Sequence, residues 1–342
     1  MMTTTPPPSR SASPSSAAMQ PPTSAAESVP VTPQAGREVV LRHRVQYAAL
    51  RAIIGALGRL GFHRASAFGA QLGLLGYRPF GVRRDVVQKQ IAAAFPEWNG
   101  ERVRATARAA YASLGRTTVE AAIMSRYDHR SILSLVEEPE TWPVMQRAMA
   151  HGRGVILVAG HLGNWELAGA YLGARGVDME VVARQQENPL FDAYLTRTRE
   201  RAGMKVIYDG DAVRRVPRAL RGNAAVALLI DQGGANLAST WVPFFGRFAK
   251  TPRGPAIFAL RMEAPIVFCA PLRRPDGRFS LTFEEVPVRA TGDRNADVDR
   301  IVADCTAVLE RWVRKAPEQY FWHHRRWKHQ RPDTPAELGN PL

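Results

Sequence analysis

The chain has 342 residues, and its 45% apolar content is enough for one large hydrophobic core or two small ones. Its 46 Lys and Arg against 31 Asp and Glu give a formal net charge of +15, which favours an anionic partner. Nucleic acid, an anionic lipid surface and an acidic carrier protein all fit that charge. A general preference for Arg in the encoding genome can explain part of it. The two cysteines, Cys269 and Cys305, are too few for a disulfide framework and match no zinc spacing, so we expect buried thiols and no metal.

Residues 1–38 are rich in Pro, Ser, Thr and Ala and contain no aromatic residue. Such a segment cannot bury enough apolar surface to fold, so we predict a disordered tail. It lacks the charged start and hydrophobic centre of a signal peptide. We expect one domain over residues 39–330, mainly helical over 39–150 and α/β over 151–330, and a flexible end over 331–342.

Apolar residues recur at helical spacing over residues 45–62, with Arg51 and Arg59 on another face. This stretch is a poor membrane-spanning helix, because an arginine at the centre of a span costs about 2.5 kcal/mol or more. It suits a helix lying in the interface of an anionic membrane. An ordinary amphipathic helix packed on the domain fits the pattern equally well.

The remaining elements follow in chain order from the hydrophobic periodicity. Residues 65–150 are expected to be helical, with distinct helices over 82–95 and 101–124. The predicted strands are 155–158, 177–183, 205–208, 225–230, 266–271 and 279–286. The predicted helices among and after them are 164–175, 190–202, 212–221, 255–262 and 297–315. This alternation predicts an α/β fold with a central, largely parallel mixed sheet flanked by helices, preceded by the helical, membrane-associating segment.

Two polar residues directly follow predicted strands. His161 comes after the first strand and Asp231 after the fourth. Ligands of open parallel sheets bind beyond the carboxyl ends of the strands. Both residues are therefore candidates for a functional site.

His161 has the chemistry of a general base. An imidazole can accept a proton from an attacking hydroxyl and return it to a leaving group, provided that a partner orients the ring. Glu166, five residues on in the first turns of the next helix, can fold back onto that ring. Gly160 and Gly163 permit the tight passage from strand to helix. His-x4-Glu alone is a weak pattern, and a structural histidine is the alternative.

Four blocks of sequence, in order, resemble the bacterial late acyltransferases of lipid A biosynthesis, the lauroyl and myristoyl transferases. The first and most specific is GVILVAGHLGNWEL over Gly154–Leu167. The other matching segments are Ala94–Pro96, then Ile230–Gln232 with Trp241–Gly246 and Thr251–Pro255, and finally Pro317–Lys328. The resemblance covers about residues 45–330. It places the chain among the His-x4-Asp/Glu acyltransferases.

The resemblance implies transfer of an acyl chain from an acyl carrier protein thioester to the hydroxyl of a 3-hydroxyacyl group on a lipid A precursor. It makes His161 the general base, Glu166 its orienting carboxylate, and Arg199 the group that polarises the acyl carbonyl or binds phosphate. No covalent enzyme intermediate is needed, because the hydroxyl can attack the thioester directly, and no cofactor is expected. The enzyme would act at the cytoplasmic face of the inner membrane, as a peripheral or monotopic protein. A phosphatidylinositol mannoside, an ornithine lipid or another glycolipid as acceptor, and acyl-CoA as donor, are the alternatives.

Further residues are candidates for binding substrate. Asn164 lies in the first block, Arg184 at a strand end suits a phosphate, and Asp231 suits a structural or supporting role. Phe245 and Arg247 could seat an acyl chain beside a phosphate, or belong to a packed loop. The segment 322–327 has the composition of a nucleic-acid patch, but the resemblance favours a lipid-facing or structural segment and no nucleic-acid partner. A non-catalytic membrane- or nucleic-acid-binding protein would leave His161 and Glu166 without a use.

Overall fold

The computed structural model describes residues 37–233 and 237–342. The tail predicted over residues 1–38 lies outside these residues, apart from its last two. The first part of the described chain is helical, as predicted. Its helices are α1 (Leu41–Leu57), α2 (Phe62–Tyr77), α3 (Arg84–Ala94), α4 (Gly100–Ile123), α5 (His129–Ser134) and α6 (Trp142–Ala150).

The helix predicted over residues 45–62 is wrong at its carboxyl end. α1 ends at Leu57, and α2 starts at Phe62 on a new axis. The turn between them ends at Gly61, whose φ of 74° belongs to the left-handed region that favours glycine. Within the described residues, no helix is both long enough and apolar enough to cross a membrane.

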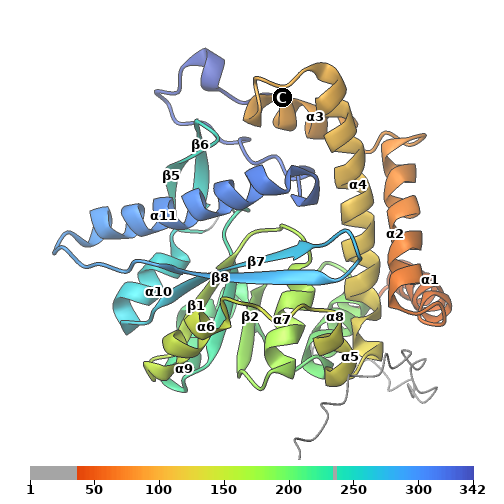
Figure 1. The fold of residues 1–342 in the computed structure, drawn as a ribbon, viewed down its shortest axis with the longest axis horizontal. Helices are drawn as coiled ribbons and strands as arrows, with labels where there is room; N and C mark the ends of the chain where they lie inside the picture. Colours follow the sequence, from red (N-terminus) through yellow and green to blue (C-terminus); the bar gives the residue numbers. More distant parts are fainter. Residues whose placement is uncertain (1–36, 234–236) are drawn as a thin grey trace, which may run out of the picture.

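A six-stranded sheet forms the centre of the molecule (Figure 1). Its strands are β1 (Val155–Ala159), β2 (Met179–Ala183), β3 (Met204–Tyr208), β4 (Ala225–Leu229), β7 (Ile266–Arg273) and β8 (Phe279–Val286). Their order is β3-β2-β4-β1-β7-β8, and every neighbouring pair is parallel except β7 with β8. The predicted largely parallel mixed sheet is therefore confirmed.

Helices cover both faces of this sheet. Successive side chains of β1 point to opposite faces. Ile156 and Val158 join a core with α9 (Ala212–Arg221), α10 (Gly254–Met262) and α11 (Arg294–Lys315). Val155 and Leu157 join a second core with α7 (Trp165–Ala174) and α8 (Pro189–Arg201), together with α5 and α6. Both faces of β1 are buried, which explains why its sequence is continuously apolar rather than alternating.

A two-stranded hairpin was not predicted from the sequence. β5 (Ser239–Phe244) pairs antiparallel with β6 (Arg247–Pro252) and stands beside α11 (Figure 1). Its two-residue turn, Phe245–Gly246, has positive φ at both positions, as hairpin turns prefer. Phe245 is an unusual residue for such a turn, so the turn signal in the sequence was weak.

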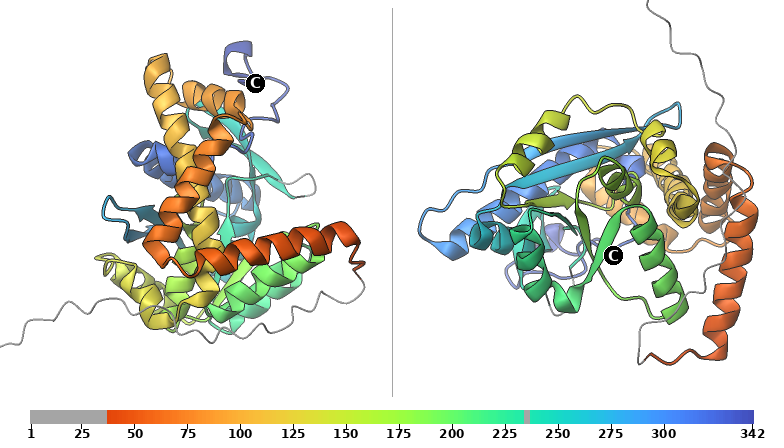
Figure 2. Two further views of the ribbon diagram at one scale, coloured as in Figure 1. Left: turned by 90° about the vertical axis from the view of Figure 1, so that its right-hand side faces the viewer. Right: turned by 90° about the horizontal axis from the view of Figure 1, so that it is seen from below.

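α2 lies antiparallel and very close to α4. A Cβ atom on Gly73 would stand 2.0 Å from the carbonyl oxygen of Tyr111, and one on Gly69 would stand 2.5 Å from that of Gly115. Glycine is therefore required at these contacts, because any side chain would separate the two helices. Figure 2 shows α1 and α2 together on one outer side of the molecule, with α4 behind them.

Candidate functional site

The candidate site is built on the turn between β1 and α7, residues 160–164, which we call the His161 turn. Its backbone is held from two sides. The amide of Asn164 donates to the carbonyl of Pro271 on β7, and the amide of Gly163 donates to that of Gln319 near the C-terminus. The carbonyl of His161 accepts from the amide of Phe321. Two segments distant in sequence, β7 and the C-terminal segment, thus fix the position of the imidazole.

Gly163 is the residue on which this turn depends. Its φ is 59°, and a Cβ atom there would lie 1.7 Å from the carbonyl oxygen of Pro271. Any other residue would push the turn off β7, so the glycine of the predicted block has a steric reason.

Asp231 is the carboxylate that holds His161. Its Oδ1 lies 2.7 Å from His161 Nδ1, and its Oδ2 accepts from the backbone amide of His161 at 2.8 Å. The register of the sheet explains the contact. β1 and β4 pair with Ala159 opposite Leu229, so residues two positions further on come to lie side by side at the carboxyl edge. His161 is partly exposed, whereas Asp231 is buried.

The surroundings of Asp231 keep it ionised. Burial opposes the charge, but the charge of His161 and its two hydrogen bonds outweigh burial and lower the pKa of Asp231 to about 2. The positive charge of the buried Arg326 acts in the same direction. Burial, together with the charge of Asp231 and a hydrogen bond to it, raises the pKa of Tyr320 well above its usual value. Tyr320 therefore remains a neutral hydroxyl beside an anion.

His161 retains one ring nitrogen for a substrate. With Nδ1 on Asp231, Nε2 has no hydrogen-bond partner within the described residues. The rings of Trp165 and Phe321 flank the imidazole, with centroids 4.8 and 5.8 Å from its own. This arrangement can orient an imidazole with a free basic nitrogen, which general-base catalysis requires.

Glu166 and Arg199 form an ion pair with each other. Arg199 Nε and Nη2 donate to the two carboxylate oxygens of Glu166 at 3.0 and 2.5 Å. The structure thus places Arg199, rather than His161, on Glu166, which corrects the predicted contact. Burial would lower the pKa of Arg199, but Glu166 reverses this, so the net pKa is raised. A bidentate pair of this kind holds a guanidinium in a fixed orientation.

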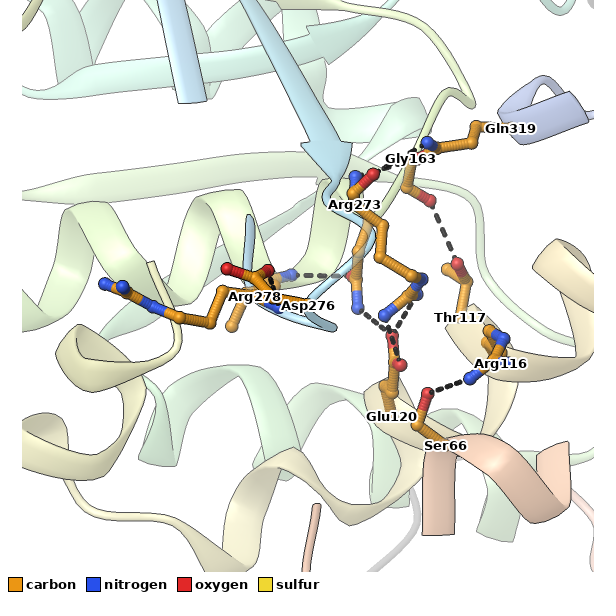
Figure 3. A network of polar contacts seen from close by, with 11 residues as sticks. Ser66, Arg116, Thr117, Glu120, Gly163, Arg273, Asp276, Arg278 and Gln319 are labelled. Atoms are coloured by element: carbon orange, nitrogen blue, oxygen red, sulfur yellow. Dashed lines mark hydrogen bonds and ion pairs between the residues drawn. The ribbon is translucent and has the colours of Figure 1, made fainter. Parts of the chain in front are cut away.

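A buried polar network links the His161 turn to α4. Thr117 Oγ1 donates to the carbonyl of Gly163 at 2.9 Å, and Glu120 accepts from Asn164 Nδ2 at 2.8 Å. Arg273, at the end of β7, donates two hydrogen bonds of 2.6 Å to the same carboxylate. Figure 3 shows Thr117 and Glu120 pointing from α4 toward Gly163 and Arg273. Glu120 is fully buried, so its carboxylate depends on these partners.

Arg273 ties this network to the C-terminal segment. Its backbone amide donates to Gln319 Oε1, and its carbonyl accepts from Gln319 Nε2. Gln319 in turn offers its own carbonyl to Gly163. One connected set of bonds therefore joins α4, β7, the C-terminal segment and the His161 turn (Figure 3).

The other residues predicted to bind substrate have different surroundings. Asn164 is buried, and both ends of its amide are used, by Glu120 and by the amide of Leu167 at the start of α7. Phe245 is buried in the core, where its ring lies 5.1 Å from that of Phe95, as in the packed-loop alternative. The guanidinium of Arg247 donates to the carbonyls of residues 93 and 339.

Arg184 was predicted to suit a phosphate at a strand end. Arg184 follows β2 and is exposed, with a guanidinium that has no partner among the described residues. It therefore remains available to an anion.

The predicted flexible end, residues 331–342, contains a short 3-10 turn over Ala336–Leu338. Arg247 donates a hydrogen bond to the carbonyl of Gly339 in this segment.

The C-terminal block is structural rather than lipid-facing. Trp322 and Trp327 are each 1% exposed, and Arg326 donates to Thr251 Oγ1 at 2.6 Å. Burial lowers the pKa values of His323 and His324 to about 4. No group of three His, Cys, Asp or Glu side chains in the described ranges could hold a metal ion.

Sequence reasoning missed Glu120, Arg273, Tyr320 and Arg326. Tyr320 and Arg326 lie in the block that carried the resemblance, so their signal was present without a role. The sequence offered one signal for Glu120. It lies three residues before the buried Ile123, on the inner face of α4, where an acidic residue is unusual. Arg273 offered none, because its partner is 153 residues away.

Comparison with known proteins adds a separate line of evidence. A family model described as bacterial lipid A biosynthesis acyltransferase matches residues 37–329. The chain is 27% identical over 270 residues to the lipid A biosynthesis lauroyltransferase of Escherichia coli (strain K12), covering 78% of this chain and 86% of that protein. It is 27% identical over 264 residues to the palmitoleoyltransferase of the same strain, covering 76% and 83%. A phosphatidylinositol mannoside acyltransferase of Mycobacterium tuberculosis (strain ATCC 25618 / H37Rv) is 29% identical over 128 residues, 36% of this chain and 40% of that protein.

Proposed function

The chain belongs to the bacterial lipid A biosynthesis acyltransferase family, and we propose that it moves a fatty acyl chain from an acyl carrier protein thioester to a hydroxyl of a lipid A precursor. The observation that carries the chemistry is the 2.7 Å contact between His161 and Asp231, which leaves Nε2 of the ring free. The net charge of +15 suits both an acidic carrier and a phosphorylated acceptor.

In the proposed reaction, His161 Nε2 takes the proton of the acceptor hydroxyl while the hydroxyl oxygen attacks the thioester carbonyl carbon. The tetrahedral intermediate then collapses, the carbon–sulfur bond breaks, and His161 returns the proton to the leaving sulfur. Asp231 stays ionised throughout and stabilises the imidazolium that forms between the two steps. The thioester is reactive enough that no covalent enzyme intermediate is required.

We assign Glu166 and Arg199 a joint role. Glu166 occupies two nitrogens of the Arg199 guanidinium, so Nη1 is the nitrogen left to face a substrate. A fixed positive charge there would stabilise the oxyanion of the intermediate or bind a phosphate of the acceptor. The exposed Arg184 at the end of β2 supports phosphate binding at the same edge of the sheet.

A second acceptor is supported by one comparison. The similarity to a phosphatidylinositol mannoside acyltransferase over 36% of this chain fits a glycolipid acceptor other than a lipid A precursor. In either case the proposed location is the cytoplasmic face of the inner membrane, where carrier and lipid acceptor meet.

Loss of the proposed base is the direct test. We expect His161→Ala to lower acyl transfer by about a hundredfold to ten-thousandfold while the protein stays folded. Purified full-length protein would be assayed with acyl carrier protein thioester and the lipid acceptor, with products identified by mass spectrometry. His151→Ala, at an exposed histidine, is the matched control. Full activity in a folded His161→Ala variant would exclude the mechanism, and transfer only to a different glycolipid would exclude the acceptor.

A further inference from the structure

The middle of α2 turns its large apolar side chains away from the domain rather than toward it. Phe62 and Tyr77 are buried at its two ends, and between them its inner face packs on α4 through small residues such as Gly69 and Gly73. Its outer face carries Phe68, Leu72 and Leu75, which are 41–47% exposed and follow one another at helical spacing. Helices on a soluble domain turn their large apolar side chains to the core. The outer face of α2 therefore points to an apolar environment outside the protein.

Segments next to α2 in sequence also expose large apolar side chains. The turn after α2 exposes Phe80 by 73% and Val82 by 57%. Twelve large apolar side chains are exposed among the described residues, and nine of them lie between residues 41 and 82. These nine are Leu41, Val45, Ile53, Leu60, Phe68, Leu72, Leu75, Phe80 and Val82. Exposed apolar side chains concentrated in one part of a chain in this way mark an interaction site. In Figure 2 the two helices that carry most of these residues stand on the same side of the molecule.

The charge of this region identifies the kind of partner. Residues 39–84 contain eight arginines and no aspartate or glutamate. A purely apolar protein partner would gain nothing from eight positive charges. An anionic bilayer matches both features, because its head groups attract arginine and its acyl region accepts the apolar side chains.

A hollow lies at the end of this surface where α2 meets α4. Its volume is 550 Å3, and it is lined by Gln71, Leu74, Leu75, Tyr77, Arg78 and Arg108. The guanidinium groups of Arg78 and Arg108 have no hydrogen bond or ion pair among the described residues. A hollow beside α9 is different, because Asp178 and Glu180 lie among its arginines. Unpaired positive charge therefore sets the α2 hollow apart.

We infer that Arg78 and Arg108 bind the head-group phosphate of an anionic phospholipid, while Leu72, Leu75 and Phe80 enter the bilayer beside it. This surface extends beyond the segment 45–62 that the sequence indicated, to α2 and the turn after it. The inference rests on the proposed membrane location of the enzyme, but not on its acyl-transfer chemistry.

Vesicle flotation of the full chain without acyl donor tests the inference. The vesicles are phosphatidylcholine alone or phosphatidylcholine with phosphatidylglycerol. We expect Arg78→Gln/Arg108→Gln to weaken binding to the anionic vesicles by about tenfold to thirtyfold. Phe80→Ser should weaken binding to both kinds of vesicle. The matched control is Arg221→Gln/Arg261→Gln, which removes the same charge from α9 and α10 and should change binding less than twofold.

Two results would overturn the inference. One is equal loss of vesicle binding in the two double variants, which would mean that only net charge matters. The other is unchanged binding of Arg78→Gln/Arg108→Gln to the anionic vesicles. His161→Ala should bind vesicles like the parent chain, so failure of the proposed chemistry and failure of this surface are distinguishable.

Discussion

Two carboxylates, Asp231 and Glu166, come after strands of the sheet near His161. Their hydrogen-bond partners show that they have different roles. Asp231 accepts from Nδ1 and from the backbone amide, so it fixes both the tautomer and the orientation of the ring. Glu166 gives both oxygens to Arg199 instead. The position of Glu166 in the first turn of α7 is compatible with either partner, and the arginine satisfies more of its hydrogen-bonding capacity.

Exchanging each carboxylate for its amide tests this division. We expect Asp231→Asn to lower kcat by about ten-thousandfold, because an amide favours the wrong tautomer and cannot stabilise imidazolium. Glu166→Gln should lower kcat/KM by about tenfold to a hundredfold, because it only loosens Arg199. Steady-state kinetics of both variants provide the measurement. Asp209→Asn, at an exposed acid after β3, is the control. A larger decrease of kcat in Glu166→Gln than in Asp231→Asn would reverse the assignment.

α4 acts on the site without contacting the imidazole. It places Thr117 and Glu120 one turn apart, so that one bonds to the backbone of the His161 turn and the other to Asn164 and Arg273. Burying this ion pair is costly unless every partner is present. Such a pair holds the His161 turn in position but adds little net stability, because apolar residues filling the same volume could stabilise the fold equally well.

Single and double variants separate position from stability. Glu120→Gln should destabilise the fold by about 3–5 kcal/mol, because Arg273, whose side chain is only 12% exposed, is left as an unpaired charge. Glu120→Gln/Arg273→Gln should recover much of that loss, measured by urea unfolding, but kcat should remain low because the His161 turn has lost its anchor. Asp178→Asn, at the exposed pair with Lys205, should cost less than about 1 kcal/mol. Full activity in the double variant would show that the turn does not need α4.

For the molecule as a whole, the order of helices and strands could be predicted because each follows from local periodicity. The helix over Ala212–Arg221 and the strand over Phe279–Val286 have the predicted bounds. The β5–β6 hairpin was missed because Pro243 interrupts one strand and its turn lacks the usual residues. The break before α2 was missed because apolar spacing continues through it.

The candidate site was harder to predict than the fold. The position of each residue directly after a strand identified His161 and Asp231 separately. Their pairing, however, depends on the register of β1 with β4. The sequence pattern of one strand does not reveal which strand pairs with it or in which register. The sequence therefore favoured the nearest acid, Glu166. The Glu120–Arg273 pair requires α4 to cross the end of β7, which no local pattern specifies.

The net charge of +15 leads to a prediction about the donor. If an acidic carrier protein delivers the acyl chain, attraction between the two surfaces should lower KM at low ionic strength. Raising salt from about 0.05 M to about 0.5 M shortens the screening length severalfold, so KM for the carrier-bound donor should rise about tenfold with kcat nearly constant. A neutral small-molecule thioester with the same acyl chain is the control, since it has no charge to screen. An equal change of KM with salt for both donors, measured by initial rates, would contradict the carrier protein as donor. The positive charge would then be explained by membrane binding alone.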